Sequence, residues 1–143
     1  MDDWQAHAAR TLREAGFRTG GARARVLGVL GAESCCLSAQ EIFARLRAHG
    51  SPVGIASVYR ALELLVELRL VQRVELGEGL ARYEARRPDG DHHHHVVCDG
   101  CGRVDAFSDE SLEAALAEVA DGVGFAVDAH DVVLRGACGD CRG

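Results

Sequence analysis

The segment His92–Cys101 constrains this chain more than any other, because it runs four consecutive histidines into the Cys-x-x-Cys pair Cys98 and Cys101. A second Cys-x-x-Cys pair, Cys138 and Cys141, lies near the end of the sequence. Two such pairs supply the four thiolates of a closed tetrahedral zinc site. The spacing therefore predicts that these four cysteines hold a structural Zn²⁺ ion.

The four histidines predict further metal ligands. Successive side chains of an extended strand point to opposite faces, so His92 and His94 would face one way and His93 and His95 the other. One short strand could then serve two different metal sites. An affinity tag stands at a terminus, whereas this run is internal, so we do not interpret it as a tag.

Disulfide bonds are the main alternative for the paired cysteines, but nothing else indicates secretion. The start Met1–Trp4 is acidic and polar, without the apolar core of a signal peptide. No apolar run approaches the roughly 20 residues of a membrane span. We expect a cytoplasmic protein without a membrane partner, and reduced thiols in that compartment favour metal ligation over disulfides.

The two halves of the chain differ in charge. The net charge of the whole chain is −6. Residues 1–87 carry 13 arginines and 10 acidic residues, a net charge of +3, whereas residues 88–143 carry 3 arginines and 12 acidic residues, a net charge of −9. The first half could present a basic face to phosphates, and the acidic second half suits cations. Nucleic-acid binding is therefore expected from the first half alone.

The pattern of apolar residues in residues 1–87 predicts four helices and then a hairpin. The helices are expected at Trp4–Ala15, Arg23–Leu30, from the cap Ser38 to about His49, and at Ile55–Leu68. Two alternating stretches, Leu70–Glu75 and Leu80–Ala85, flank Gly77-Glu78-Gly79, which is a hairpin signal. This order is typical of a winged helix-turn-helix, whose fourth helix would enter the major groove of DNA and expose Ser57, Tyr59 and Arg60.

Residues 88–91 predict a hinge, and residues 92–143 a small α+β domain. Strands are expected at His92–Cys98, Arg103–Phe107, Phe125–Val127 and His130–Leu134. Between them, Ser108 is expected to cap a helix that buries Leu112, Leu116 and Val119. A domain of this size usually needs a metal or an oligomer interface for stability.

Four stretches carry a resemblance over nearly the full length of the chain: Ser38–Phe43, Gly54–Arg60, His92–Cys101 and Cys138–Cys141. In their order and spacing, the chain resembles the ferric uptake regulator family of bacterial metal-dependent repressors. The resemblance implies a homodimer that binds a palindromic double-stranded operator through winged helices and dimerises through its C-terminal domain. It also implies that metal binding fixes the angle between the two domains.

The resemblance assigns roles residue by residue. It places the structural zinc on Cys98, Cys101, Cys138 and Cys141. It places a second metal site, within the dimerisation domain, on His92, His94, Glu113 and His130. It places the regulatory site at the hinge on His93, His95, Cys36 and Glu84, with Cys35 as a substitute for Cys36. The DNA contacts are expected from Tyr59, Arg60, Ser57 and Arg23.

The sensed metal and the biochemical class leave alternatives. Zinc-sensing relatives place a cysteine near the hinge, where this chain has Arg87, and an aspartate near the start of the wing, where Gln72 stands. Imidazole plus thiolate nevertheless favours zinc over iron or manganese. The main hypothesis is a repressor of zinc-uptake genes with Zn²⁺ as corepressor, and the alternative is a repressor responding to iron(II), nickel, manganese or peroxide. A zinc hydrolase lacks its His-Glu-x-x-His motif here, and a zinc-storage protein would need no DNA-reading helix; we therefore expect neither an enzyme nor a small-molecule substrate.

Overall fold

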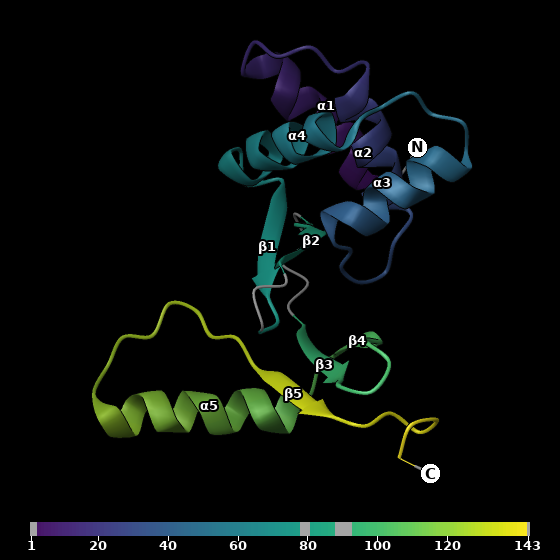
Figure 1. The fold of residues 1–143 in the computed structure, drawn as a ribbon. Helices are drawn as coiled ribbons and strands as arrows, with labels where there is room; N and C mark the ends of the chain where they lie inside the picture. Colours follow the sequence, from purple (N-terminus) through teal and green to yellow (C-terminus); the bar gives the residue numbers. More distant parts are fainter. Residues whose placement is uncertain (1–2, 78–80, 88–92, 143) are drawn as a thin grey trace. The chain divides into compact units, whose positions relative to one another are not determined.

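The computed structural model describes residues 3–77, 81–87 and 93–142. The chain divides into two compact units, Met1–Asp91 and His92–Gly143, and each is described by itself (Figure 1). The segment 88–91, predicted as a hinge, lies outside the described residues. Within the described part of the chain, no helix is both long and apolar enough to cross a membrane.

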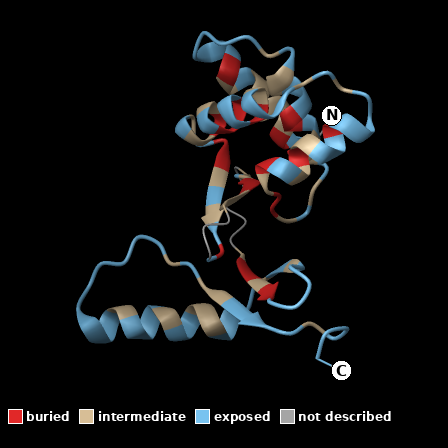
Figure 2. Ribbon diagram, viewed as in Figure 1, coloured by how far each residue is buried: buried red, intermediate tan, exposed pale blue. Residues whose placement is uncertain are grey.

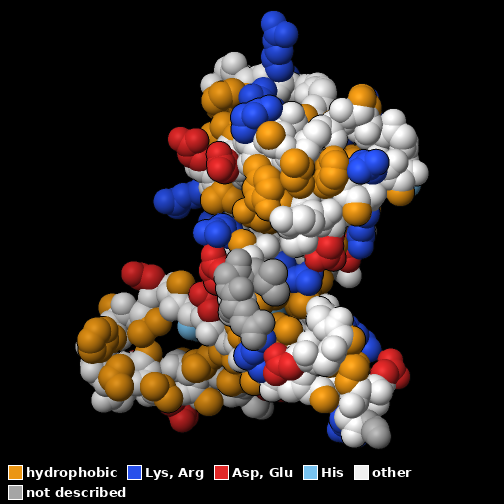
Figure 3. All heavy atoms as spheres, viewed as in Figure 1, with side chains coloured by type: hydrophobic (Ala, Val, Ile, Leu, Met, Phe, Trp, Pro, Cys, Tyr) orange, Lys and Arg blue, Asp and Glu red, His pale blue; other side chains and the backbone are white. Residues whose placement is uncertain are grey.

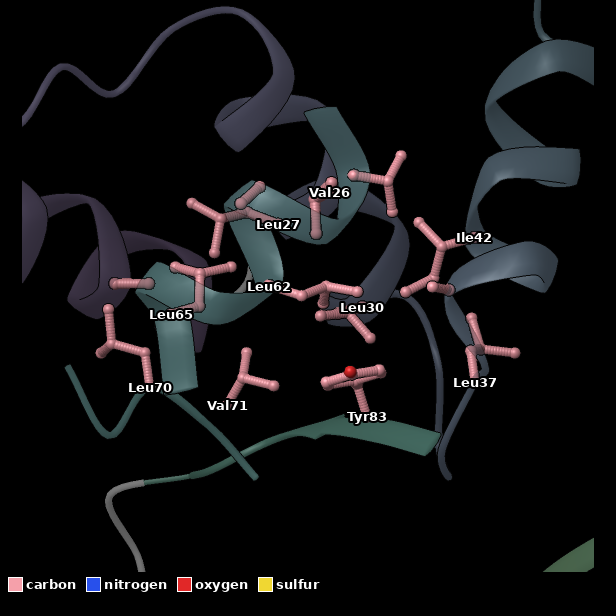
Figure 4. Packing of buried hydrophobic residues seen from close by; sticks show 14 of the residues in the cluster. Val26, Leu27, Leu30, Leu37, Ile42, Leu62, Leu65, Leu70, Val71 and Tyr83 are labelled. Atoms are coloured by element: carbon pink, nitrogen blue, oxygen red, sulfur yellow. The ribbon is translucent and has the colours of Figure 1, made fainter. Parts of the chain in front are cut away.

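Four helices begin the first unit: α1 (Asp3–Glu14), α2 (Ala22–Gly31), α3 (Ala39–Ala48) and α4 (Ile55–Glu67). The helical spacing of apolar residues explains how they pack, since Trp4, Ala8 and Leu12 repeat every four residues and are all buried. The predicted capping box at the start of α3 is present, because Ser38 accepts from the Glu41 amide and Glu41 accepts from the Ser38 amide. Figure 4 shows side chains of α2, α3 and α4 meeting in one core above Tyr83.

A two-stranded antiparallel hairpin follows α4 and packs beneath the helices. Strand β1 (Val71–Glu75) pairs with β2 (Ala81–Ala85), as the alternating pattern predicted, and the turn residues 78–80 lie outside the described residues. The hairpin is joined to the helical part by an antiparallel bridge between Leu37 and Tyr83, with N···O distances of 2.9 and 2.7 Å. The buried indole of Trp4 also donates to the Leu70 carbonyl at 3.0 Å. Helices and hairpin therefore form one body with the element order of a winged helix.

The second unit contains a three-stranded sheet and one helix. Strand β3 (His94–Cys98) lies in the centre, antiparallel to β4 (Val104–Phe107) and parallel to β5 (Val133–Gly136). Helix α5 (Glu110–Val123) connects β4 to the segment before β5. The fold is α+β, as predicted, and the central strand is the one that carries the histidines and the first cysteine.

Four details of the second unit differ from the sequence-based predictions. Helix α5 is capped by Asp109, whose carboxylate accepts from the Leu112 amide at 2.9 Å, rather than by Ser108. Segment 125–127 is not a strand, and the strand predicted at 130–134 occurs instead at Val133–Gly136. Helix α5 buries none of its residues (Figure 2), and Val119 is 60% exposed. An amphipathic stripe shows which face of a helix is apolar, but it does not show whether this chain alone covers that face.

Candidate metal centres and nucleic-acid surface

The four predicted zinc ligands come together in the second unit. Cys98 ends β3 and Cys101 lies in the turn after it, while Cys138 and Cys141 lie in the loop after β5. The parallel pairing of β3 with β5 places Cys98 opposite Gly136, which brings both loops to the same end of the sheet. The four Sγ atoms lie within 4.8 Å of one another.

Backbone amides favour the thiolate form of two of these cysteines. The Cys138 amide donates to Cys98 Sγ at 3.3 Å, and this bond, more than any other contact, lowers the pKa of the Cys98 thiol to about 6. The Cys141 amide likewise lowers the pKa of Cys138. The pKa of the Cys141 thiol is raised to about 12 by its hydrogen bonds with the sulfurs of Cys98, Cys138 and Cys101. The four sulfurs share protons through hydrogen bonds within the cluster. A divalent cation bound to all four would take the place of those protons.

The sulfur spacing also fits zinc. With Zn–S bonds of about 2.3 Å, two sulfurs of a tetrahedral site lie about 3.8 Å apart. The Sγ atoms of Cys101 and Cys138 are 3.8 Å apart. Gly100 packs closely on the cluster, since a Cβ there would lie 3.1 Å from Cys141 Sγ and would have to displace it slightly. The donor set and the spacing are those of a structural Zn²⁺ site.

A second cluster joins β3, α5 and the segment before β5. One carboxylate of Glu113 contacts two imidazoles, with Oε1 at 2.6 Å from His94 Nε2 and Oε2 at 2.8 Å from His130 Nε2. His94 is 2% exposed and its ring lies 5.2 Å from that of His130, centroid to centroid. His92, the fourth residue predicted for this site, lies outside the described residues.

Hydrogen bonding fixes the tautomer of His94. The Val132 amide donates to Nδ1 at 3.3 Å, so a neutral His94 carries its proton on Nε2 and donates it to Glu113. A metal ion on Nε2 would take the place of that proton, and the neutral imidazole would then carry its proton on Nδ1, where ligating histidines usually donate a hydrogen bond. The contact between Nδ1 and the Val132 amide would then give way, because both groups would be donors.

The alternation of the histidines is visible in the second unit. His94 turns toward Glu113, whereas the rings of His93 and His95 lie against each other with centroids 5.0 Å apart. The other two residues predicted for the hinge site, Cys36 and Glu84, belong to the first unit. The grouping of His93 and His95 with Cys36 and Glu84 therefore stays a prediction.

Cys36 and Glu84 are neighbours across the first unit. They flank the bridged residues Leu37 and Tyr83, and both are buried. In an antiparallel bridge, residues next to the bridged pair share the face opposite to it. Leu37 and Tyr83 point into the core, so Cys36 and Glu84 face away from it. The pKa of the Cys36 thiol is raised, first by its hydrogen bond with Cys35, then by burial and by the charges of Cys35 and Glu84.

The predicted DNA-contacting residues gather around the start of α4. Arg60 donates to Ser57 Oγ at 3.1 Å, and the hydroxyl of Tyr59 accepts from Gln40 at 2.9 Å. Arg23 donates to the Arg18 carbonyl at 3.2 Å. A cleft of about 500 Å³ joins Arg23, Ser57 and Arg60, whereas Tyr59 lines a separate hollow with Gln40. The cleft is lined by Arg18, Gly20, Gly21, Ala22, Arg23, Ser57, Arg60 and Ala61.

Arg18 was missed by the sequence analysis. It lies in the loop between α1 and α2, far in sequence from α4, and only the tertiary fold brings it to the cleft. Three guanidinium groups around one cleft suit phosphate oxygens. The surface is therefore chemically suited to nucleic acid.

Residues 14–135 match the model of the ferric uptake regulator family. The ferric uptake regulation protein of Bacillus subtilis is 36% identical over 108 residues, which cover 75% of this chain and 72% of that protein. The crystal structure of the Vibrio cholerae ferric uptake regulator matches with a TM-score of 0.81 and 31% identity, covering 91% of this chain and 98% of that one. The Helicobacter pylori ferric uptake regulator, described as having three functional metal-binding sites, matches with a TM-score of 0.84 and 26% identity over 98% of this chain and 92% of that one.

Proposed function

The chain belongs to the ferric uptake regulator family of metal-binding, DNA-binding transcriptional repressors, and we propose that it represses metal-uptake genes as a homodimer with a metal ion as corepressor. The observation that carries the proposal is the central strand β3. His94 at its start belongs to the cluster with Glu113 and His130, while Cys98 at its end belongs to the four-cysteine cluster. One strand thus supplies ligands to two candidate metal clusters, and such an arrangement suits a domain controlled by metal.

Each predicted site has a distinct part in this proposal. Cys98, Cys101, Cys138 and Cys141 would hold a zinc ion that keeps the second unit folded. His94, Glu113 and His130, with His92, would bind a metal within the dimerisation domain. His93 and His95, with Cys36 and Glu84, would form the regulatory site that links this domain to the winged helix. A metal ion held there would favour the domain arrangement that binds DNA, which is a population shift.

An exposed apolar surface supports dimerisation through the second unit. Val119, Val123 and Phe125 are 60%, 60% and 73% exposed in the single chain. Figure 3 shows hydrophobic side chains gathered over α5. Exposed apolar patches of this kind mark protein interfaces. In a dimer, the two α4 helices would lie about one DNA turn, roughly 34 Å, apart or a multiple of it, and would thus read a palindromic site.

The effector metal has two candidates. The relatives named above are ferric uptake regulators, which supports iron(II) better than the zinc favoured by the sequence analysis. Zinc is retained as the second candidate on one observation, the buried thiol of Cys36 beside the carboxylate of Glu84. Thiolate selects zinc over iron(II), whereas oxygen and imidazole ligands serve both ions. We place the repressor in the cytoplasm, where its DNA target lies.

Selection of an operator followed by metal titration tests the proposal. The metal-loaded protein is used to select duplexes from a random library, and binding to the selected duplex is then measured with protein stripped of regulatory metal. Iron(II) without oxygen, Zn²⁺, Mn²⁺ and Ni²⁺ are compared. We expect a palindrome whose binding requires one of these metals, is lost in His93→Ala and persists in His49→Ala, a change at an exposed residue outside the sites. Failure to select a palindrome with any metal would contradict the proposal.

A further inference from the structure

Two adjacent cysteines, Cys35 and Cys36, place their sulfurs 3.7 Å apart. In an extended strand adjacent side chains would point to opposite faces. The chain instead bends at Ser34 and Cys35, just before the bridge residue Leu37, and this bend brings the two thiols together. Cys36 is buried and Cys35 is half-buried.

Hydrophobic packing does not explain the pair. A free buried cysteine usually behaves as a small apolar side chain within a core. Cys36 is 4% exposed, yet it is not a member of the hydrophobic cluster that contains its neighbour Leu37. It faces Glu84 instead, across the bridge. Polar and sulfur-bearing groups are thus gathered on the face opposite to the core.

The spacing of the two sulfurs is that of a metal chelate. Two thiolates on one tetrahedral Zn²⁺ lie about 3.8 Å apart. The pair Cys101 and Cys138, within the candidate zinc site, has the same separation of 3.8 Å. The hydrogen bond with Cys35 and burial raise the pKa of the Cys36 thiol, and the repulsion that two thiolates this close to each other and to Glu84 would experience raises it further. A shared divalent cation would offset that repulsion.

We propose that Cys35 and Cys36 together chelate one thiophilic divalent cation, of the class of Zn²⁺ and Cd²⁺, through both Sγ atoms. The inference rests on the proposed function, because this pair would be the contribution of the first unit to the regulatory site. The sequence predicted Cys35 only as a substitute for Cys36 at one ligand position, whereas the 3.7 Å between their sulfurs lets both bind one cation. Two thiolates select soft cations over iron(II) and manganese(II).

Cadmium titration of the full-length protein tests the chelate. The four-cysteine site is first filled with zinc, and zinc content is followed throughout so that displacement is detected. Thiolate-to-cadmium charge-transfer absorbance is then measured in the wild type, Cys35→Ser, Cys36→Ser and the control Ser34→Ala. We expect each cysteine variant to lose about half of the absorbance and at least about tenfold in cadmium affinity. Wild-type absorbance and affinity in Cys35→Ser would overturn the inference.

Alkylation of the unmutated protein gives a second measurement that needs no variant to fold. Zn²⁺ should protect both Cys35 and Cys36 from an alkylating reagent, as resolved by fragmentation of their shared peptide. Protection of Cys36 alone, or of neither, overturns the inference.

Operator binding separates the two proposals. If Cys35→Ser binds cadmium as the wild type does and still binds its operator only with metal, the chelate is wrong and the repressor proposal stands. If the chelate is present but no metal alters operator binding, the proposed function fails instead.

Discussion

Loss of the four-cysteine site should unfold the second unit and leave the first intact. Among the described residues of this unit, His94, His95, Val97 and Cys98 are the buried ones, and α5 buries none. The unit therefore has almost no hydrophobic core of its own. Structural Zn²⁺ contributes about 10–16 kcal/mol of apparent folding free energy in small zinc modules near neutral pH. This contribution exceeds the free energy of unfolding of a small domain, which is roughly 5 kcal/mol. Cys98→Ser, which removes one ligand, should leave this unit largely unfolded.

The single tryptophan allows the two units to be followed separately. Trp4 lies 1% exposed in the core of the first unit, so its emission reports that unit alone. Amide hydrogen exchange along α5 reports the second unit. In Cys98→Ser, we expect α5 amides to lose at least about a thousandfold in protection, which corresponds to about 4 kcal/mol, with Trp4 emission unchanged.

The matched control is Asp140→Asn, an exposed change between Cys138 and Cys141 that keeps all four thiols. It should retain zinc and α5 protection. If Cys98→Ser kept the α5 protection of the wild type after zinc was removed, the unit would be held by other contacts, and the reasoning from its missing core would be refuted.

Three further predictions concern the other sites and the pH range. Glu113→Gln should weaken metal binding at the His94–Glu113–His130 cluster by at least about tenfold in isothermal titration calorimetry, because one of the two carboxylate contacts is lost together with the charge. The control Glu110→Gln, an exposed change one turn earlier in α5, should bind metal as the wild type does. Arg60→Ala and Arg23→Ala should each reduce the slope of log K against log salt for operator binding by about 1.8, which is about 0.9 for each of the two copies in the dimer. Arg13→Ala, at the end of α1, should not change the slope, and an unchanged slope in all three would remove the cleft from the DNA interface. Without metal the pKa of the Cys98 thiol is lowered to about 6 whereas that of the Cys141 thiol is raised to about 12, so zinc binding must displace protons from the cluster. The apparent zinc affinity should therefore fall as the pH is lowered, as measured with a competing zinc indicator; an affinity that does not change with pH would contradict this account.

Local sequence patterns were sufficient to predict those features of the fold that depend only on nearby residues. The capping box of Ser38 and Glu41, the hairpin and the zinc-ligand spacing all involve short sequence intervals or repeated motifs, and the sequence predicted them. The cap of α5 was misplaced by one residue, because Ser108 and Asp109 are both good caps and the backbone decides between them. The strand predicted at 125–127 does not form, since an apolar stretch does not by itself provide a neighbouring strand.

By itself, the sequence determined the family, the α+β class and the donor atoms, because the alternation of β3 and the two Cys-x-x-Cys pairs are properties of the local chain. The tertiary structure decided which donors meet. It placed Glu113 and His130 against His94, a grouping that only the family resemblance had implied, brought Arg18 to the cleft beside α4, and set Cys35 against Cys36 at a distance suited to one cation. The physical reason is that ligand spacing of a few ångströms depends on how β3, α5, β5 and the bend before α3 pack. Packing between distant segments is not encoded in the spacing of any one motif.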